Sequence, residues 1–197
     1  VENTARTTGD VARRDETLQH LVDALNAAAG EDRWAVVSSP SNIGTREDAI
    51  RVAFIYQPAK VRPVGQSRIF DDSTFTGIAR QPLAQEFAPV AGDDHIVAVV
   101  NHFKSKGTVS RNDDATADGQ GNNARLRADM SQALLEHLAQ QDDWRDVPTF
   151  LIGDFNAYSQ EDAIDVLNRA GYATLPQPRP SYQYDNKVGS LDHVLAN

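Results

Sequence analysis

Two long apolar runs constrain the fold of this 197-residue chain more than any other feature. HIVAVVNHF (95–103) and VPTFLIGD (147–154) contain so few polar residues that both faces of each strand must be covered by other elements. In LAQEFAPV (83–90), apolar and polar residues alternate instead, which is typical of a half-buried strand. The remaining strand candidates are shorter and lie at 33–39, 49–58 and 189–196.

Three further segments have the spacing of amphipathic helices. They are Asp15 to Ala29, Ala124 to Gln140, and a short helix from Glu161 that ends at Gly171. Helices and strands therefore mix along the chain, which predicts an α/β domain with sheets packed between helices. The polar stretch 104–121 is a long loop, and loops of this length are often functional. No linker divides residues 1–197, so we expect a single domain.

The composition limits the chemistry that the chain can perform. There is no cysteine, which excludes disulfides, thiolate metal sites and a cysteine nucleophile. Any metal must be held by oxygen or imidazole, which favours magnesium, calcium or manganese. The net charge of −9 argues against binding of nucleic acid by bulk electrostatics. Residues 96–111 nevertheless hold Lys104, Lys106 and Arg111 without a single acid, and this segment is either a local anion site or a solvated loop.

The motif GDFNA (153–157) follows one of the buried strands. Asp154 and Asn156 are two apart and project the same way on an extended chain. An aspartate and an asparagine side by side can hold a hard cation, a water or a phosphate oxygen. Ordinary turns at strand ends use the same residues, so this motif alone leaves both interpretations open.

Other polar residues interrupt apolar runs in the same manner. Arg80, His102 and Asp192 each lie near the end of a predicted strand. Hydrolysis of a phosphodiester needs a cation, a carboxylate that orients water, an imidazole, and an arginine that holds the phosphate. These residues and GDFNA together meet that need, although His102 alone could be structural. His193 points to the opposite face from Asp192, and we expect it to be structural.

Five motifs carry a family resemblance. The motifs GDFNA, VVNHFKSKG, RQPLAQEF, DAIRVAFIYQP and GSLDHVLA resemble the endonuclease/exonuclease/phosphatase superfamily, in particular its bacterial extracellular nucleases, which are similar to pancreatic deoxyribonuclease. The resemblance implies a four-layered α/β sandwich, in which two mixed β-sheets lie face to face and helices flank them, incomplete here at its edges. It also implies a site that depends on magnesium, with manganese or calcium as alternatives.

The resemblance assigns a role to each residue of the site. Asp154 would orient or activate the attacking water, and Asn156 would bind the phosphate or order that water. His102 would stabilise the phosphate or protonate the leaving group, and Arg80 would contact a phosphate oxygen. Asp192 matches an aspartate that pairs with a catalytic histidine. The metal ligands implied in this chain are Asp154, Asn156 and Asp192.

Further residues match the family less directly. Lys104 and Lys106 would contact backbone phosphates beside the site. Asp48 falls near an acid that supports a histidine in relatives. Asn123 resembles a family residue at the start of a helix, and we expect Asn122 or Asn123 to cap that helix.

The ends of the chain depart from the family pattern. Val1-Glu2-Asn3 resembles the tail of the motif that carries the main metal-binding glutamate, so we expect that glutamate just before residue 1. The catalytic histidine that pairs with Asp192 is expected after Asn197. We therefore expect the domain to lack its first strand or strands and its C-terminal histidine segment. This chain alone would be weakly active or inactive, while the protein it derives from would be active.

The function predicted from these features is metal-dependent hydrolysis of DNA, with RNA as a further substrate, by a secreted nuclease of low sequence specificity. Secretion is implied by the resemblance alone, because the chain shows no signal peptide, and it has no apolar run that would span a membrane. One alternative is a phosphodiesterase or phosphatase that acts on a phospholipid headgroup or a small phosphate ester. Another is a noncatalytic domain that only binds.

Overall fold

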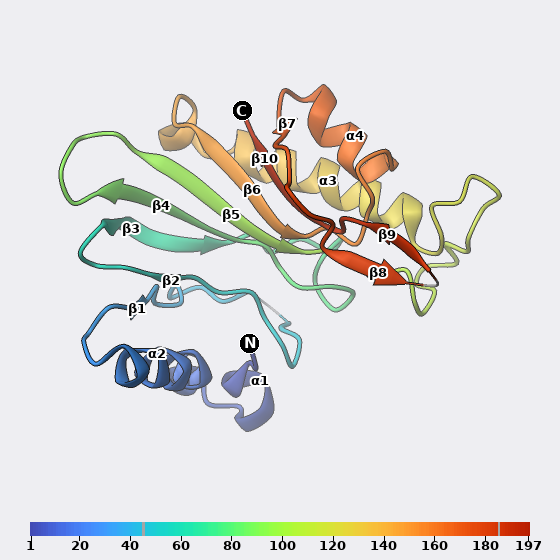
Figure 1. Cartoon of the computed structure of the whole chain (residues 1–197). Coiled ribbons are helices and arrows are strands. Elements are labelled where there is room, and N and C mark those ends of the chain that lie inside the picture. The colour runs from blue at the N-terminus through green and yellow to red at the C-terminus, as the bar shows by residue number, and fades with distance from the viewer. Residues whose placement is uncertain (45, 185) are drawn as a thin grey trace.

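The chain folds into stacked layers of helices and sheets (Figure 1). The computed structural model describes residues 1–44, 46–184 and 186–197. A six-stranded sheet is covered on one face by α3 and α4, and on the other face by a small sheet with α2 beyond it. No helix in these ranges is both long and apolar enough to cross a membrane. The helices are α1 (Thr4–Thr8), η1 (Val11–Arg13), α2 (Glu16–Ala29), α3 (Ala124–Ala139), η2 (Asp142–Trp144) and α4 (Asp162–Arg169).

The large sheet has the strand order β3-β4-β5-β6-β10-β7. Among the strands that the structure describes, only β5 and β6 pair in parallel, and α3 makes the crossover between them. The small sheet is the antiparallel pair β1-β2, and β8 and β9 form a separate hairpin. The strands are β1 (Ala35–Val36), β2 (Ile55–Tyr56), β3 (Val61–Ile69), β4 (Leu83–Pro89), β5 (Ile96–His102), β6 (Thr149–Asp154), β7 (Ala173–Thr174), β8 (Tyr182–Tyr184), β9 (Lys187–Gly189) and β10 (Asp192–Ala196).

Two apolar cores lie on opposite faces of the large sheet. Val97 and Val99 of β5 face α3 and α4, where they join Met130 and Leu134 in one cluster. Ala98, on the other face, packs with residues of β2 and β4 between the two sheets. This arrangement confirms the predicted layered α/β fold, and it confirms that β5 and β6 are covered on both faces.

Several strands differ from their predictions. β4 is buried on both faces rather than half-buried, because the small sheet and the helices each cover one side of it. β3 was not predicted, since Pro63 and Gly65 interrupt its pattern; as the edge strand of the sheet it tolerates both. The second sheet is smaller than expected, because β1 and β2 hold only two residues each.

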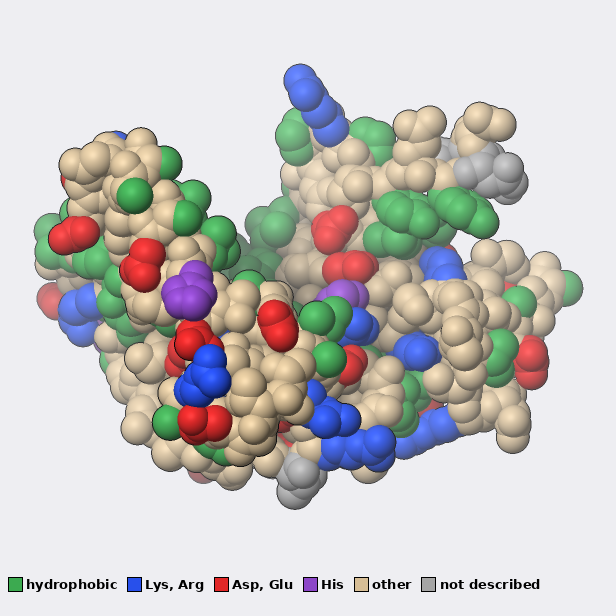
Figure 2. All heavy atoms as spheres, turned by 90° about the horizontal axis from the view of Figure 1, so that it is seen from below, with side chains coloured by type: hydrophobic (Ala, Val, Ile, Leu, Met, Phe, Trp, Pro, Cys, Tyr) green, Lys and Arg blue, Asp and Glu red, His purple; other side chains and the backbone are tan. Residues whose placement is uncertain are grey.

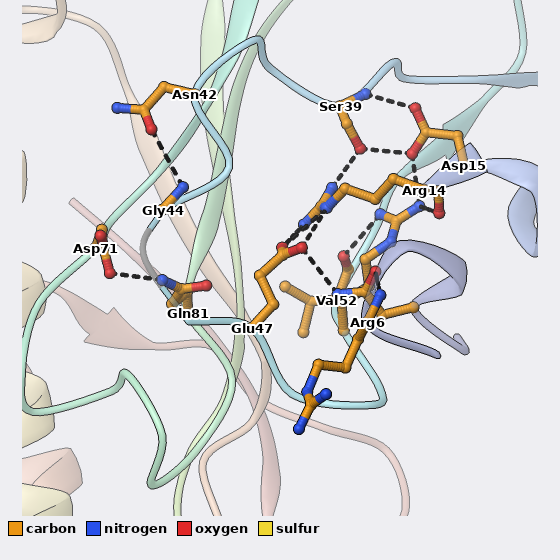
Figure 3. Close-up of polar contacts among 12 residues, drawn as sticks. Arg6, Arg14, Asp15, Ser39, Asn42, Gly44, Glu47, Val52, Asp71 and Gln81 are labelled. Carbon is orange, nitrogen blue, oxygen red and sulfur yellow. Dashed lines mark hydrogen bonds and ion pairs between the residues drawn. The ribbon is translucent and has the colours of Figure 1, made fainter. Parts of the chain in front are cut away.

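A buried ionic network joins the residues just before α2 to the segments that follow β1 and precede β2 (Figure 3). Arg14 donates through Nε to both carboxylate oxygens of Glu47, at 2.9 and 3.1 Å, and its guanidinium also contacts Ser39. The side chains of Arg14 and Glu47 are only 5% and 9% exposed. Asp15 accepts from the Ser39 backbone at 2.8 Å and from Arg51 at 2.6 Å. These contacts fix the loop that passes beneath the large sheet.

Candidate functional site

Three predicted site residues are direct neighbours across the large sheet. His102 at the end of β5 is the register partner of Asp154 at the end of β6. Asp192 at the start of β10 is the register partner of Asp154 from the other side. Register partners project from the same face of a sheet, and His102 Nε2 lies 3.6 Å from Asp154 Oδ2. The sheet therefore brings an imidazole and two carboxylates together.

A glycine allows the close approach of β5 and β6 at this point. Gly153 has a φ of +122°, a conformation that L side chains rarely adopt. A Cβ atom at Gly153 would lie 2.2 Å from the carbonyl oxygen of Asn101 on the neighbouring strand. The first residue of GDFNA is thus a requirement of packing, and it sets the position of the aspartate that follows it.

Asn156 is held in a tight turn directly after Asp154. Its backbone N–H donates to Asp154 Oδ1 at 2.8 Å, and its Nδ2 donates to the Phe103 carbonyl at 3.0 Å. Its φ is +50°, in the left-handed region that asparagine tolerates better than most residues. Because the amide nitrogen faces Phe103, the amide oxygen is the atom that Asn156 can offer to a cation or a water.

Arg80 comes from the loop between β3 and β4. Its Nε is 3.6 Å from Asp48 Oδ2, and this buried Nε has no hydrogen-bond partner among the described residues. Asp48 thus pairs with Arg80, and its support of a histidine stays a prediction. The field of Arg80 also reaches His102, since it is among the charges that lower the pKa of that imidazole.

Burial shifts two of the site groups in opposite directions. It raises the pKa of Asp154 above its ordinary value, and the Asp192 carboxylate adds to this rise. Burial also lowers the pKa of His102, with Arg80 as the next largest cause. His102 is consequently neutral at neutral pH and can donate a hydrogen bond without carrying a charge.

The donors at this edge suit a hard divalent cation. Asp154 and Asp192 supply carboxylate oxygens, and Asn156 adds an amide oxygen, which are the ligand types that magnesium takes. Within the part of the chain that the structure describes, no group of three or more His, Cys, Asp or Glu side chains is arranged to hold a metal. The residues thus fit only a cation that keeps several of its waters.

The surface around these groups carries separated charges. Figure 2 shows one face of the molecule, with Lys and Arg side chains along its lower right border and acidic side chains further up. Such a layout can hold an anion and a cation side by side. It also explains how a chain with a net charge of −9 can offer a local site for a phosphate.

The two lysines predicted to contact phosphate have different surroundings. Lys104 is half-buried at the start of the long loop. Lys106 Nζ instead donates to Glu161 at 2.5 and 2.6 Å and to the Gln120 carbonyl at 2.6 Å. Arg127, which is fully buried, lies 3.3 Å from the same carboxylate. Lys106 therefore holds the loop to the start of α4, where its ammonium is already paired with a carboxylate that it shares with Arg127.

Asn123 has a structural role that differs from the predicted cap. It precedes α3 with a φ of +63°, but its side chain makes no capping bond to the helix. Its Nδ2 donates to the carbonyls of Ser105 and Thr108, and its Oδ1 accepts from the Ser110 N–H at 2.8 Å. The capping prediction is thus wrong for Asn123, because this residue closes the long loop instead.

His193 has the structural role that its position in the sequence indicates. It is 3% exposed and its Nε2 lies 2.8 Å from the Ala157 carbonyl.

The sequence interpretation missed Glu161, whose partners are more than 30 residues away. The exposed tyrosines of β8 were missed as well. The alternation in YQY (182–184) was the available signal, because residues two apart on a strand lie on one face.

Comparison with known proteins gives one family and several related folds. The family model described as "Endonuclease/Exonuclease/phosphatase family" matches residues 15–197. No curated protein sequence matches the chain. An endonuclease/exonuclease/phosphatase family protein from Bacteroides thetaiotaomicron is similar in structure, with 12% identity and a TM-score of 0.56 over 90% of this chain and 64% of that one.

Two further solved structures are similar. The mannosyl-6-phosphatase of Bacteroides thetaiotaomicron has 12% identity and a TM-score of 0.55, over 90% of this chain and 67% of that one. The human Nocturnin catalytic domain with bound sulfate has 17% identity and a TM-score of 0.51, over 72% of this chain and 50% of that one. At these identities the likeness establishes the fold alone, and the chain spans about half to two thirds of the length of these structures.

Proposed function

Because the chain belongs to the endonuclease/exonuclease/phosphatase family, whose members hydrolyse phosphodiester or phosphate ester bonds, we propose that it acts as a metal-dependent nuclease on DNA. The observation that carries the proposal is the register of three strands, which aligns His102, Asp154 and Asp192 on one face. Arg80 lies at the same edge, and its charge acts on His102. These are the groups that hydrolysis of a phosphodiester requires.

Each group has a role that follows from its surroundings. Asp154 orients the attacking water and takes up its proton as the water oxygen bonds to phosphorus. The bond from phosphorus to the leaving oxygen breaks, and that oxygen takes a proton from solvent. Neutral His102 donates a hydrogen bond to a phosphate oxygen, and Arg80 neutralises part of the charge that develops there. Asn156, fixed by its bond to Phe103, presents its amide oxygen to the water. A divalent cation held by Asp154 and Asp192 would supply the remaining neutralisation of phosphate charge.

DNA is favoured over a small ester by the charges beside the site. Lys104 can contact a phosphate next to the one that Arg80 holds, and such a contact does not depend on base sequence. Low sequence preference follows from this. RNA has the same backbone charge and is a further substrate. We also propose that the protein is secreted, which rests on the resemblance of its motifs to bacterial extracellular nucleases.

The test is nicking of supercoiled plasmid by the complete protein in magnesium, with and without a chelator. Asp154→Ala should lower the rate by roughly a hundred- to ten-thousandfold, because the water loses its orienting carboxylate. The matched control is Asp165→Ala, which should leave the rate unchanged, because Asp165 forms an ion pair on α4 with the exposed Arg169.

Two outcomes would overturn the proposal. Nicking that persists in Asp154→Ala at the rate of Asp165→Ala would remove this site from the reaction. Intact plasmid together with hydrolysis of a sugar phosphate or a phospholipid headgroup would keep the chemistry and change the substrate.

A further inference from the structure

A groove lies next to the candidate site and shares a residue with it. The groove encloses about 370 Å³ between the start of the long loop and the β8-β9 hairpin, a volume within the range of small-molecule sites. Asn156 forms part of its wall together with Lys106, Tyr158, Tyr182 and Tyr184. A molecule bound at the catalytic edge can therefore extend into this groove.

The hairpin presents two aromatic rings to solvent. Tyr182 and Tyr184 are two apart on β8 and so project from one face. Their rings are nearly parallel, with an interplanar angle of 15° and centroids 6.3 Å apart. They are 41% and 69% exposed, whereas the ring of Phe155 near the site is fully buried. The two side chains therefore form an exposed aromatic face on one short strand.

Close packing fixes the hairpin relative to the catalytic residues. A Cβ atom at Gly189 would lie 2.6 Å from the ring of Tyr158, so the strand backbone rests directly on that ring. The backbone N–H groups of Leu191 and Asp192 both donate to Ser181 Oγ at 3.2 Å. The tyrosines are thus tied to the start of β10, where the site carboxylate begins.

The wall opposite the hairpin is polar. Lys106 Nζ lies 5.3 Å from the centroid of the Tyr158 ring and is paired with Glu161. A groove with aromatic faces, an ion-paired lysine and a catalytic residue in its wall suits a flat, uncharged ring attached to a phosphate. A nucleobase has this chemistry, and it stacks on aromatic rings without sequence preference.

We infer that this groove is a base-stacking subsite, in which Tyr182 and Tyr184 hold the nucleobase next to the scissile phosphate. The inference rests on the proposed nuclease function and gives its substrate a second point of contact. It predicts that the enzyme prefers a backbone with a base at this position over the same backbone without one.

The experiment compares two strands of equal length and charge, an oligothymidylate and its counterpart in which tetrahydrofuran replaces every base. The double variant Tyr182→Ala/Tyr184→Ala should lose roughly 5- to 100-fold in kcat/KM on the oligothymidylate and little on the base-free strand. Tyr182→Phe/Tyr184→Phe keeps the rings and should restore the preference. Val188→Ala is the matched control, because Val188 is 66% exposed on the same hairpin and pairs with Gln183 rather than with a tyrosine.

A binding measurement separates failure of the subsite from failure of the proposed function. Fluorescence anisotropy with labelled oligothymidylate and the Asp154→Asn protein reports stacking without turnover. Weaker binding in the double alanine variant supports the subsite even if the wild-type protein cuts neither strand. Failure to cut either strand would then count against the proposed nuclease function but not against the subsite. Equal binding and an unchanged preference would overturn the subsite, as would tyrosine variants whose only effect is loss of self-association in sedimentation.

Discussion

Glu161, which holds Lys106 of the long loop, allows a quantitative prediction of how far Glu161→Gln destabilises the fold. The Glu161 carboxylate, 8% exposed, is the partner of both Lys106 and the fully buried Arg127. Glutamine has nearly the same shape but no charge, so two cations in a buried site lose their counter-ion. Removal of one partner from a buried ion pair costs about 3–5 kcal/mol in free energy of unfolding. For a domain of this size, that cost lowers Tm by roughly 6–20 °C, at about 2–4 °C per kcal/mol.

Thermal and urea unfolding followed by circular dichroism would measure the loss. The control is Glu136→Gln, the same change at an exposed position of α3, where we expect a difference within about 0.5 kcal/mol. Hydrogen exchange should also rise in residues 104–123, because Lys106 no longer holds the loop to α4. A loss below about 1 kcal/mol for Glu161→Gln, with unchanged exchange in this loop, would refute the idea that this carboxylate anchors it.

Three further predictions concern the site itself. Gly153→Ala should unfold at least about 1–3 kcal/mol more easily in urea, because its Cβ would collide with the Asn101 carbonyl and its φ is strained for alanine; stability equal to wild type would contradict this packing. Burial raises the pKa of Asp154, so ionisation favours the unfolded state; Asp154→Asn should therefore melt above wild type at neutral pH, and the gap should close below the ordinary aspartate pKa. Burial lowers the pKa of His102, so the midpoint of its NMR titration should lie below that of a free histidine. The stability that neutral His102 contributes should be fully present above the free-histidine pKa and be lost as the pH falls from there through the lowered pKa. A midpoint at or above the free value would be inconsistent with its buried position.

Local patterns in the sequence predicted the interior of this fold better than its edges. The apolar run of β6 and the helical spacing of α3 each reflect burial of the segment itself, so a short window of sequence contains the signal. β3 contains Pro63 and Gly65 and becomes a strand because β4 pairs with it. Pairing of this kind depends on distant residues, and intrinsic preferences do not predict it.

The same distinction applies to the residues of the candidate site: local sequence identifies some of them, and others depend on distant contacts. His102, Asp154 and Asp192 could be identified because each polar residue interrupts or bounds an apolar run. The partner of Lys106 could not be identified, since Glu161 lies 55 residues further along the chain. A lysine in an acid-free segment gives the same pattern whether it faces a substrate or a buried carboxylate, and only the tertiary structure distinguishes the two.

The register of β10 on β6 makes the site sensitive to chain length as well as to substitution. Asp192 stands opposite Asp154, and His193, the next residue, is buried on the other face. Deletion of one residue from the connection before β10 could be accommodated in two ways: the loop stretches, or the strand slides by one position. A slide would exchange the two faces of β10, so that an imidazole takes the place of the carboxylate while an acid enters the core. Insertions and deletions in this connection are therefore a route by which a related enzyme could gain or lose a metal ligand without any point mutation.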